Sequence, residues 1–349
     1  MRTAERARVS PAEREVLSDR LRRLLARTGL LRPHLVFLGA TVLGFVIVTA
    51  LLALAIGAPF VLPGERVSPA LGTSPALPLQ IGVAGWLIGQ LLRWRLSGRD
   101  ANQLGQRLAT DGTYLLMFVV VLYCHFHIKM WMPLLNGRLH DDWYFQIDQD
   151  LRPVLEGLGR VRAALASLLP AADLWYQGAQ LGLFIGSFWI LGLGDRRWHH
   201  RNMTALLLNL MIGPLAYLLA PAVGPFIFET GPNRAATAAQ QAMYAQFTEL
   251  AAQGPSWLAA HGGQYFTAPL AAMPSLHVSA ACIVCYYTLR ARSWFAPLMV
   301  FFALWIFIDS VVSRWHYLID LPPGILLAAV SILIANRVGN GGLGAARRS

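Results

Sequence analysis

Charged residues and cysteines are scarce in this sequence. Only 13% of its 349 residues are Asp, Glu, Lys or Arg, whereas soluble domains usually carry about 25%. Three cysteines are too few to form a disulfide framework, and no internal repeat or low-complexity tract is visible. These shortages exclude a disulfide scaffold and a collagen-like chain, and they argue against a disordered protein or an ordinary soluble enzyme.

Hydrophobic residues, by contrast, make up 56% of the chain. They form runs long enough to cross the roughly 30 Å of hydrocarbon in a bilayer. The pattern predicts an all-α, polytopic membrane protein with about eight transmembrane helices. The predicted spans are residues 35–61, 77–92, 113–133, 174–194, 203–228, 276–289, 293–312 and 317–336.

The basic residues predict the orientation of these spans. The net charge is +11, and every basic residue except Lys129 is an arginine. With eight spans, one side of the membrane receives 21 Arg and 7 acidic residues, and the other receives 7 Arg and 11 acidic residues. The positive-inside rule therefore predicts a multi-pass protein of the cell membrane with both termini in the cytoplasm. On this interpretation the basicity is a topology signal and not a nucleic-acid footprint.

Four parts of the chain are expected. The basic N-terminal tail contains an Arg-rich amphipathic stretch, Ala12–Leu31, which could lie on anionic headgroups or remain solvated. The parts are a cytoplasmic tail at 1–34, two additional transmembrane helices at 35–112, a six-helix catalytic core at 113–336 and a cytoplasmic tail at 337–349.

Ionisable residues gather at the outer ends of the last spans, where we expect function. The motif Met273–His277, read M-P-S-L-H, opens the sixth span, and Ser313–Asp320, read S-R-W-H-Y-L-I-D, opens the eighth. The 39 residues from His277 to His316 allow one span inward, a tight turn and one span back. The two motifs are therefore expected to meet at the same outer level.

The residue types in these motifs predict phosphoryl chemistry. His316 and Asp320 are spaced i,i+4, so on a helix the carboxylate could fix one imidazole nitrogen and leave the other free to attack. His277 could act as general acid and base. Ser275 at a helix N-terminus and Arg314 could bind phosphate oxygens, although Arg314 could also only snorkel to the interface. This set needs no metal ion and no cofactor.

Several candidate residues also have a purely structural interpretation. Ser275 and Asp320 could be helix N-caps, and His277 could be a hydrogen-bonded histidine in the membrane. Lys129 and His125, spaced i,i+4 near the outer end of the third span, could meet a headgroup phosphate or only mark the interface.

Two long outer loops, residues 134–173 and 229–274, are a further pointer, because long loops in compact proteins are usually functional. Asp141, Asp142 and Asp148 in the first loop could bind a polyol or a cation, or could belong to a solvated loop.

The paired motifs P-S-L-H, ending at His277, and H-Y-L-I-D, beginning at His316, resemble the type 2 phosphatidic acid phosphatase superfamily. The details are closest to its inositol phosphorylceramide synthase-like branch. Residues 217–225, read Y-L-L-A-P-A-V-G-P, resemble that branch's Pro-rich segment, and residues 141–148 resemble its first outer loop. The resemblance covers roughly residues 113–336.

This resemblance implies an integral membrane enzyme that acts on a lipid phosphate or phosphodiester at the extracytoplasmic face. Its implied partners are membrane lipids and an alcohol acceptor. His316 would form a phosphohistidine, Asp320 would support it, His277 would be the general acid and base, and Ser275 would contact phosphate.

Two departures from the family pattern affect the choice of function. The K-x6-R-P motif is missing, and Ser310 stands where the motif arginine usually lies. We therefore expect a phosphotransferase, with a lipid phosphate phosphatase as the alternative. Two alternative hypotheses belong to other functional classes. One is a non-enzymatic lipid transporter. The other is a metal-dependent hydrolase that uses His277, His316 and Asp320 as metal ligands.

Overall fold

A computed structural model describes the chain except for residues 1–31, 65–75, 97–99, 193 and 347–349. The described residues are mostly helical and include no β-strand, so the all-α prediction is confirmed. The stretch Ala12–Leu31 lies outside the described residues. The helices are α2 (Pro33–Ile56), α3 (Ala76–Leu96), α4 (Ala101–Leu135), α5 (Asp141–Asp150), α6 (Arg152–Ala166), α7 (Trp175–Gly186), α8 (Arg196–Tyr217), α9 (Arg234–Gln253), α10 (Pro255–Tyr265), α11 (Leu276–Arg290), α12 (Ala296–Val312) and α13 (Leu321–Ala346). Short helical turns are η1 (Ala172–Leu174), η2 (Ser187–Leu191), η3 (Pro225–Ile227) and η4 (Leu318–Asp320).

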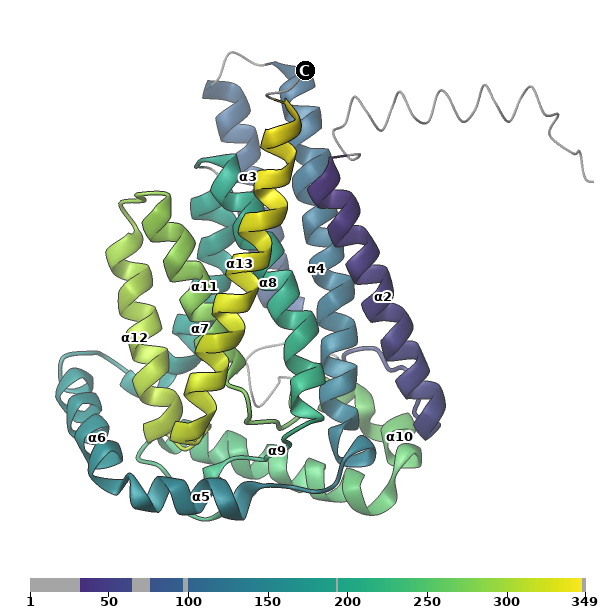
Figure 1. The fold of residues 1–349 in the computed structure, drawn as a ribbon. Helices are drawn as coiled ribbons and strands as arrows, with labels where there is room; N and C mark the ends of the chain where they lie inside the picture. The colour runs from purple at the N-terminus through teal and green to yellow at the C-terminus, as the bar shows by residue number, and fades with distance from the viewer. Residues whose placement is uncertain (1–31, 65–75, 97–99, 193, 347–349) are drawn as a thin grey trace, which may run out of the picture.

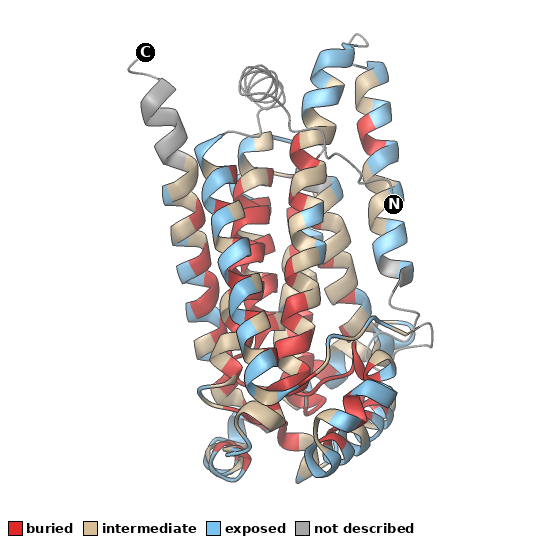
Figure 2. Ribbon diagram, turned by 90° about the vertical axis from the view of Figure 1, so that its right-hand side faces the viewer, coloured by how far each residue is buried: buried red, intermediate tan, exposed pale blue. Residues whose placement is uncertain are grey.

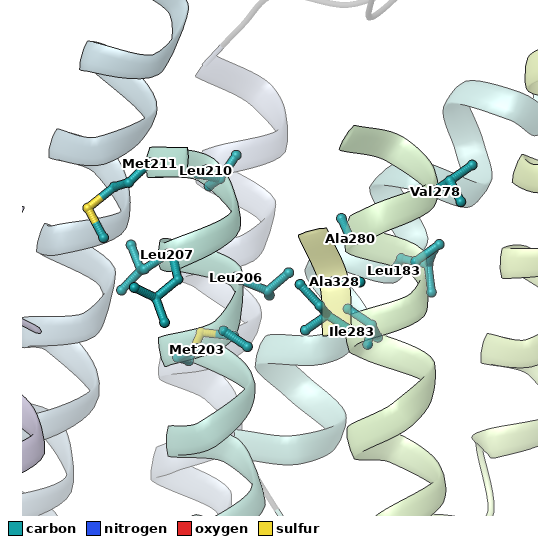
Figure 3. Close-up of a cluster of buried hydrophobic side chains, with 14 of the residues drawn as sticks. Leu183, Met203, Leu206, Leu207, Leu210, Met211, Val278, Ala280, Ile283 and Ala328 are labelled. Atoms are coloured by element: carbon teal, nitrogen blue, oxygen red, sulfur yellow. The ribbon is translucent and has the colours of Figure 1, made fainter. Parts of the chain in front are cut away.

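The long helices form a bundle around α8 (Figure 1). Helix α8 packs against α4, α11 and α13, while α2 covers α4 and α12 packs against α7 and α11. Leu206 and Leu207 of α8 belong to one buried cluster with Ile283 of α11 and Ala328 of α13 (Figure 3). The small side chain of Ala328 allows α13 to approach closely, so the core fixes where the ends of α11 and α13 lie.

Among the described residues, three helical stretches are long and apolar enough to cross a membrane: α2, α4 and Leu318–Gly339. Helix α12 is apolar but shorter. Figure 2 shows many exposed residues on the outer faces of the bundle. On α2 they include the large apolar side chains of Leu43, Leu51 and Leu54. A face of this kind suits lipid rather than water, and these features indicate a membrane protein. The total of eight spans stays a prediction.

Two predicted boundaries are wrong. The helix that contains the predicted span 113–133 begins earlier, because α4 begins at Ala101. The Asp100 side chain caps it there by accepting from the N–H groups of Asn102 and Gln103. The predicted span 203–228 begins earlier and ends at Tyr217. Prolines follow in the sequence beyond α8 and cannot supply helical N–H groups.

The two long outer loops are also different from the expectation. They fold into two pairs of helices, α5 with α6 and α9 with α10, which lie across one end of the bundle (Figure 1). Because α5 packs against η4 at the start of α13, the first of these pairs reaches the predicted catalytic motifs.

Candidate active site

The start of α11 and the connection between α12 and α13 meet at the end of the bundle covered by α5. Ser275 caps α11, and its Oγ accepts from the N–H of Val278 at 3.4 Å. The Ser275 N–H donates to the carbonyl oxygen of Asp320 at 3.1 Å, which joins the two motifs directly. A Cβ on Gly324 would lie 2.5 Å from the Ser275 carbonyl oxygen, so glycine is required for this close approach.

The hydrogen bonds of His316 determine which ring nitrogen is protonated. Its Nδ1 lies 2.9 Å from the carbonyl oxygen of Ala272 and 3.2 Å from Oδ2 of Asp320. A carbonyl oxygen can only accept, so Nδ1 carries the proton and donates it. In the neutral ring, Nε2 then presents a lone pair, which is the form that a nucleophile needs.

The contact between His316 and Asp320 does not come from a helix face, as the i,i+4 argument supposed. Helix α12 has already ended, and Tyr317 is extended before the 3₁₀ turn η4. Asp320 Oδ2 also accepts from the Tyr317 N–H at 2.8 Å, so the turn holds the carboxylate next to Nδ1 of the imidazole. Pro322 and Pro323 lie in the first turn of α13. Proline is tolerated only there in a helix, so these two residues mark the start of α13 in the sequence.

His277 faces His316 from the first turn of α11. Its Nδ1 lies 3.4 Å from Nε2 of His316, and the ring centroids are 5.6 Å apart. The same Nδ1 lies 3.0 Å from the hydroxyl of Tyr176, whose ring stacks on Trp315. Sequence reasoning missed Tyr176, because an aromatic residue at a span end normally reads as an interfacial anchor.

The carboxylate of Asp141 is buried and supports the site from α5. It accepts from the backbone N–H groups of Val223 and Gly224, and the Tyr317 hydroxyl donates to it at 2.8 Å. Burial raises the pKa of Asp141, while these hydrogen bonds act in the opposite direction. The solvated-loop interpretation is therefore wrong for Asp141, whereas Asp142 is exposed.

Asp148 holds the same connection from the other end of α5. Its carboxylate accepts from the Leu318 N–H at 2.9 Å and from Arg314 at 3.4 Å. Burial raises the pKa of Asp148 to about 6, although both of these donors pull it down. Arg314 also forms an ion pair with Glu229, which in turn binds Arg152 at 2.8 Å. Two carboxylates thus already engage Arg314, and its contact with phosphate stays a prediction.

The remaining sequence candidates lie on α4. His125 Nδ1 lies 3.0 Å from the carbonyl oxygen of Leu210. Because a carbonyl oxygen can only accept, Nδ1 donates this hydrogen bond. The Lys129 ammonium lies 5.6 Å from the ring centroid of Tyr217. Its positive charge also interacts electrostatically with the His277 ring. Among the described residues, no group of three His, Cys, Asp or Glu is arranged to hold a metal ion.

The structure thus brings His277, His316, Asp320 and Ser275 together at one place. A family model described as the PAP2 superfamily matches residues 142–334, which is just over half of the chain. The chain belongs to the PAP2 superfamily. The match includes both histidine motifs, and PAP2 membership indicates an enzyme acting on phosphate esters. No curated protein and no solved structure matches the chain.

Proposed function

We propose that this PAP2 protein is a membrane phosphotransferase that acts through a phosphohistidine on His316. Its donor would be a lipid phosphate or phosphodiester and its acceptor an alcohol, as in inositol phosphorylceramide synthases. One observation carries the proposal: Nε2 of buried His316 lies 3.4 Å from Nδ1 of His277. A phosphoryl group that binds beside this pair would meet a nucleophile in His316 and a proton carrier in His277.

In the first step, Nε2 of His316 attacks phosphorus and forms a P–N bond. The P–O bond to the leaving alcohol breaks, and protonated His277 gives its proton to that oxygen. Asp320 accepts the Nδ1 hydrogen bond throughout and stabilises the positive charge that forms on the His316 ring.

In the second step, the acceptor hydroxyl enters where the first product left. His277 takes its proton while the oxygen attacks phosphorus, and the P–N bond breaks to regenerate neutral His316. With a phosphodiester donor, an alcohol acceptor gives a new phosphodiester. With a lipid phosphate donor, an alcohol acceptor gives a new phosphate monoester and water gives free phosphate.

Other groups around the pair have supporting roles in this proposal. Lys129 would neutralise phosphate oxygens from α4, and Ser275 would offer a contact at the N-terminus of α11. Tyr176 would orient His277 through the 3.0 Å contact with Nδ1. Arg314, bound by Asp148 and Glu229, would position the loop that carries His316.

The sequence favours transfer over hydrolysis, because the K-x6-R-P motif is missing and the histidine motif has the form H-Y-x-x-D. A lipid phosphate phosphatase is the second candidate, and the same two steps with water as acceptor would produce it. For the orientation, we propose that both termini face the cytoplasm and that the two histidines face outward. The charge distribution supports this, since the Arg-rich connections lie at the end of the bundle opposite to these residues.

Purified protein in detergent would test the class of reaction. It would be offered long-chain phosphatidic acid and phosphatidylinositol, each with and without free inositol or diacylglycerol as acceptor. We expect inositol phosphate from phosphatidic acid with inositol, and an exchanged phosphodiester from phosphatidylinositol with diacylglycerol. Both are measured by mass spectrometry, and neither should form with His316→Asn. Free phosphate as the only product would replace the transferase by the phosphatase.

Trapping of the covalent intermediate would test the mechanism itself. With a ³²P-labelled donor, we expect an acid-labile and base-stable phosphoenzyme in the wild type and none in His316→Asn. Unchanged labelling of His316→Asn would remove His316 as the nucleophile.

A further inference from the structure

A cavity of about 640 Å³ opens at the end of the bundle opposite to the histidine pair. The starts of α2, α4 and α8 and the end of α13 line it. Asp320 directly precedes the other end of α13, and the 15 residues from it to Ala335 of the cavity wall correspond to roughly 22 Å of helix. The cavity is therefore separate from the candidate active site. Its walls carry five arginines: Arg32, Arg107, Arg196, Arg197 and Arg201.

Asp111 does not balance this charge. It binds Arg196 at 3.2 Å through Oδ1 and accepts from Gln90 at 3.1 Å through Oδ2. Arg32 and Arg107 form no ion pair with any described residue. Among the described residues, therefore, no carboxylate competes with a ligand for these two guanidinium groups.

The arginines also repel one another. Burial and the like charges of Arg107 and Arg32 lower the pKa of Arg196, although Asp111 pulls it upward. A bound anion would relieve this repulsion, because it would place negative charge among the guanidinium groups.

The shape of the cavity indicates the size of the anion. His200 stacks between His34 and Tyr114, with ring centroids 5.6 Å and 5.3 Å away, and these rings form a firm wall. The volume lies in the usual range for sites of organic ligands. The forked guanidinium groups bind phosphate oxygens in pairs, which favours phosphate over other anions.

We propose that this cavity binds a phosphate-bearing anion at a site distinct from the catalytic centre, with Arg32 and Arg107 as direct ligands. A phospholipid headgroup and a soluble phosphate share this chemistry. The proposal does not depend on the reaction assigned to His316.

The test measures binding in the full chain carrying His316→Asn, so that no probe is turned over. The probes are dioctanoyl phosphatidic acid, dioctanoyl phosphatidylcholine and inorganic phosphate, and binding is measured by titration calorimetry in detergent. Arg32→Gln with Arg107→Gln removes two charges without leaving a carboxylate unpaired. Arg337→Gln is the matched control, because Arg337 is exposed on α13 near the cavity and does not line it.

We expect the double variant to bind phosphatidic acid at least about tenfold more weakly than Arg337→Gln, which corresponds to about 1.4 kcal/mol. Competition by millimolar inorganic phosphate would identify a soluble phosphate as the ligand, and its failure would identify the lipid headgroup. Equal affinity of the double variant and the control would overturn the proposal. If the double variant elutes as an aggregate, Arg107→Gln alone is compared with Arg337→Gln under the same criterion.

Discussion

The two ends of the helical bundle differ in how their charged side chains are paired. At the end that holds His277 and His316, the carboxylates of Asp141, Asp148 and Asp320 are buried and accept hydrogen bonds from named backbone and side-chain groups. At the other end, five arginines line a cavity, and the carboxylate of Asp111, which binds one of them, is already engaged.

This difference separates two uses of ionisable residues in a membrane protein. Charges that are satisfied internally fix the position and tautomer of the reacting groups, which chemistry requires. Charges that are left in excess attract a ligand of opposite sign. On the two proposals above, the first end would react and the second would bind.

The largest expected effect comes from the histidines themselves. His316→Asn should lower kcat by about 10³-fold or more, because it removes the nucleophile, and His277→Asn by about 10²- to 10⁴-fold, because it removes the proton carrier. Product formation from a labelled lipid phosphate measures both. Arg337→Gln at the basic end should keep wild-type turnover, and wild-type turnover in either histidine variant would end the catalytic assignment.

A smaller effect is expected when the partner of His316 is changed. Asp320→Asn keeps the shape of the side chain but loses the charge that stabilises the His316 ring, so kcat should fall by about 10²-fold. KM should stay unchanged, since Asp320 faces His316 and not the substrate. The rate of phosphoenzyme formation, measured by rapid quench, should fall by the same factor. A rise in KM with normal labelling would show that Asp320 has another role.

The contact between the two motifs should be sensitive to one added methyl group. In Gly324→Ala, the new Cβ would lie 2.5 Å from the Ser275 carbonyl oxygen, a backbone atom that cannot turn aside. We expect a loss of about 1–3 kcal/mol of stability and a lower thermal midpoint. Gly44→Ala is the control, because its Cβ would meet no atom within 4 Å. Equal midpoints for the two variants would contradict the close approach of α13 to Ser275.

The smallest effect is a change in pH dependence. Burial raises the pKa of Asp148 from 3.8 to about 6, so the folded protein binds this proton more tightly than the unfolded chain. The stability contributed by this protonated group is complete below pH 3.8 and is lost as the pH rises through 6.

Asp148→Asn cannot titrate, so its thermal midpoint should fall less between pH 4 and pH 7 than that of the wild type. Thermal scans in one detergent at several pH values measure the difference. Parallel curves for the two proteins would show that Asp148 is not perturbed.

The sequence alone determined the class of the protein and the position of its reactive pair along the chain. Long apolar runs predict helices in a membrane because lipid cannot satisfy an open backbone, and three helices meet the length and hydropathy that crossing needs. The spacing between His277 and His316 predicts their meeting because one helical hairpin returns the chain to the same level. Pro322 and Pro323 correctly predict the start of α13, since proline fits only a first turn.

Only the tertiary structure decided how the site is supported. Tyr176, Asp141 and Asp148 reach it from segments more than 100 residues away along the chain, and no local pattern encodes such a contact. The same holds for Arg314, whose charge is matched by carboxylates of other segments, and for the basic cavity, which four helix ends form together. Periodicity and local spacing act through neighbours on one helix, whereas hydrogen bonds to buried charges depend on how separate helices pack.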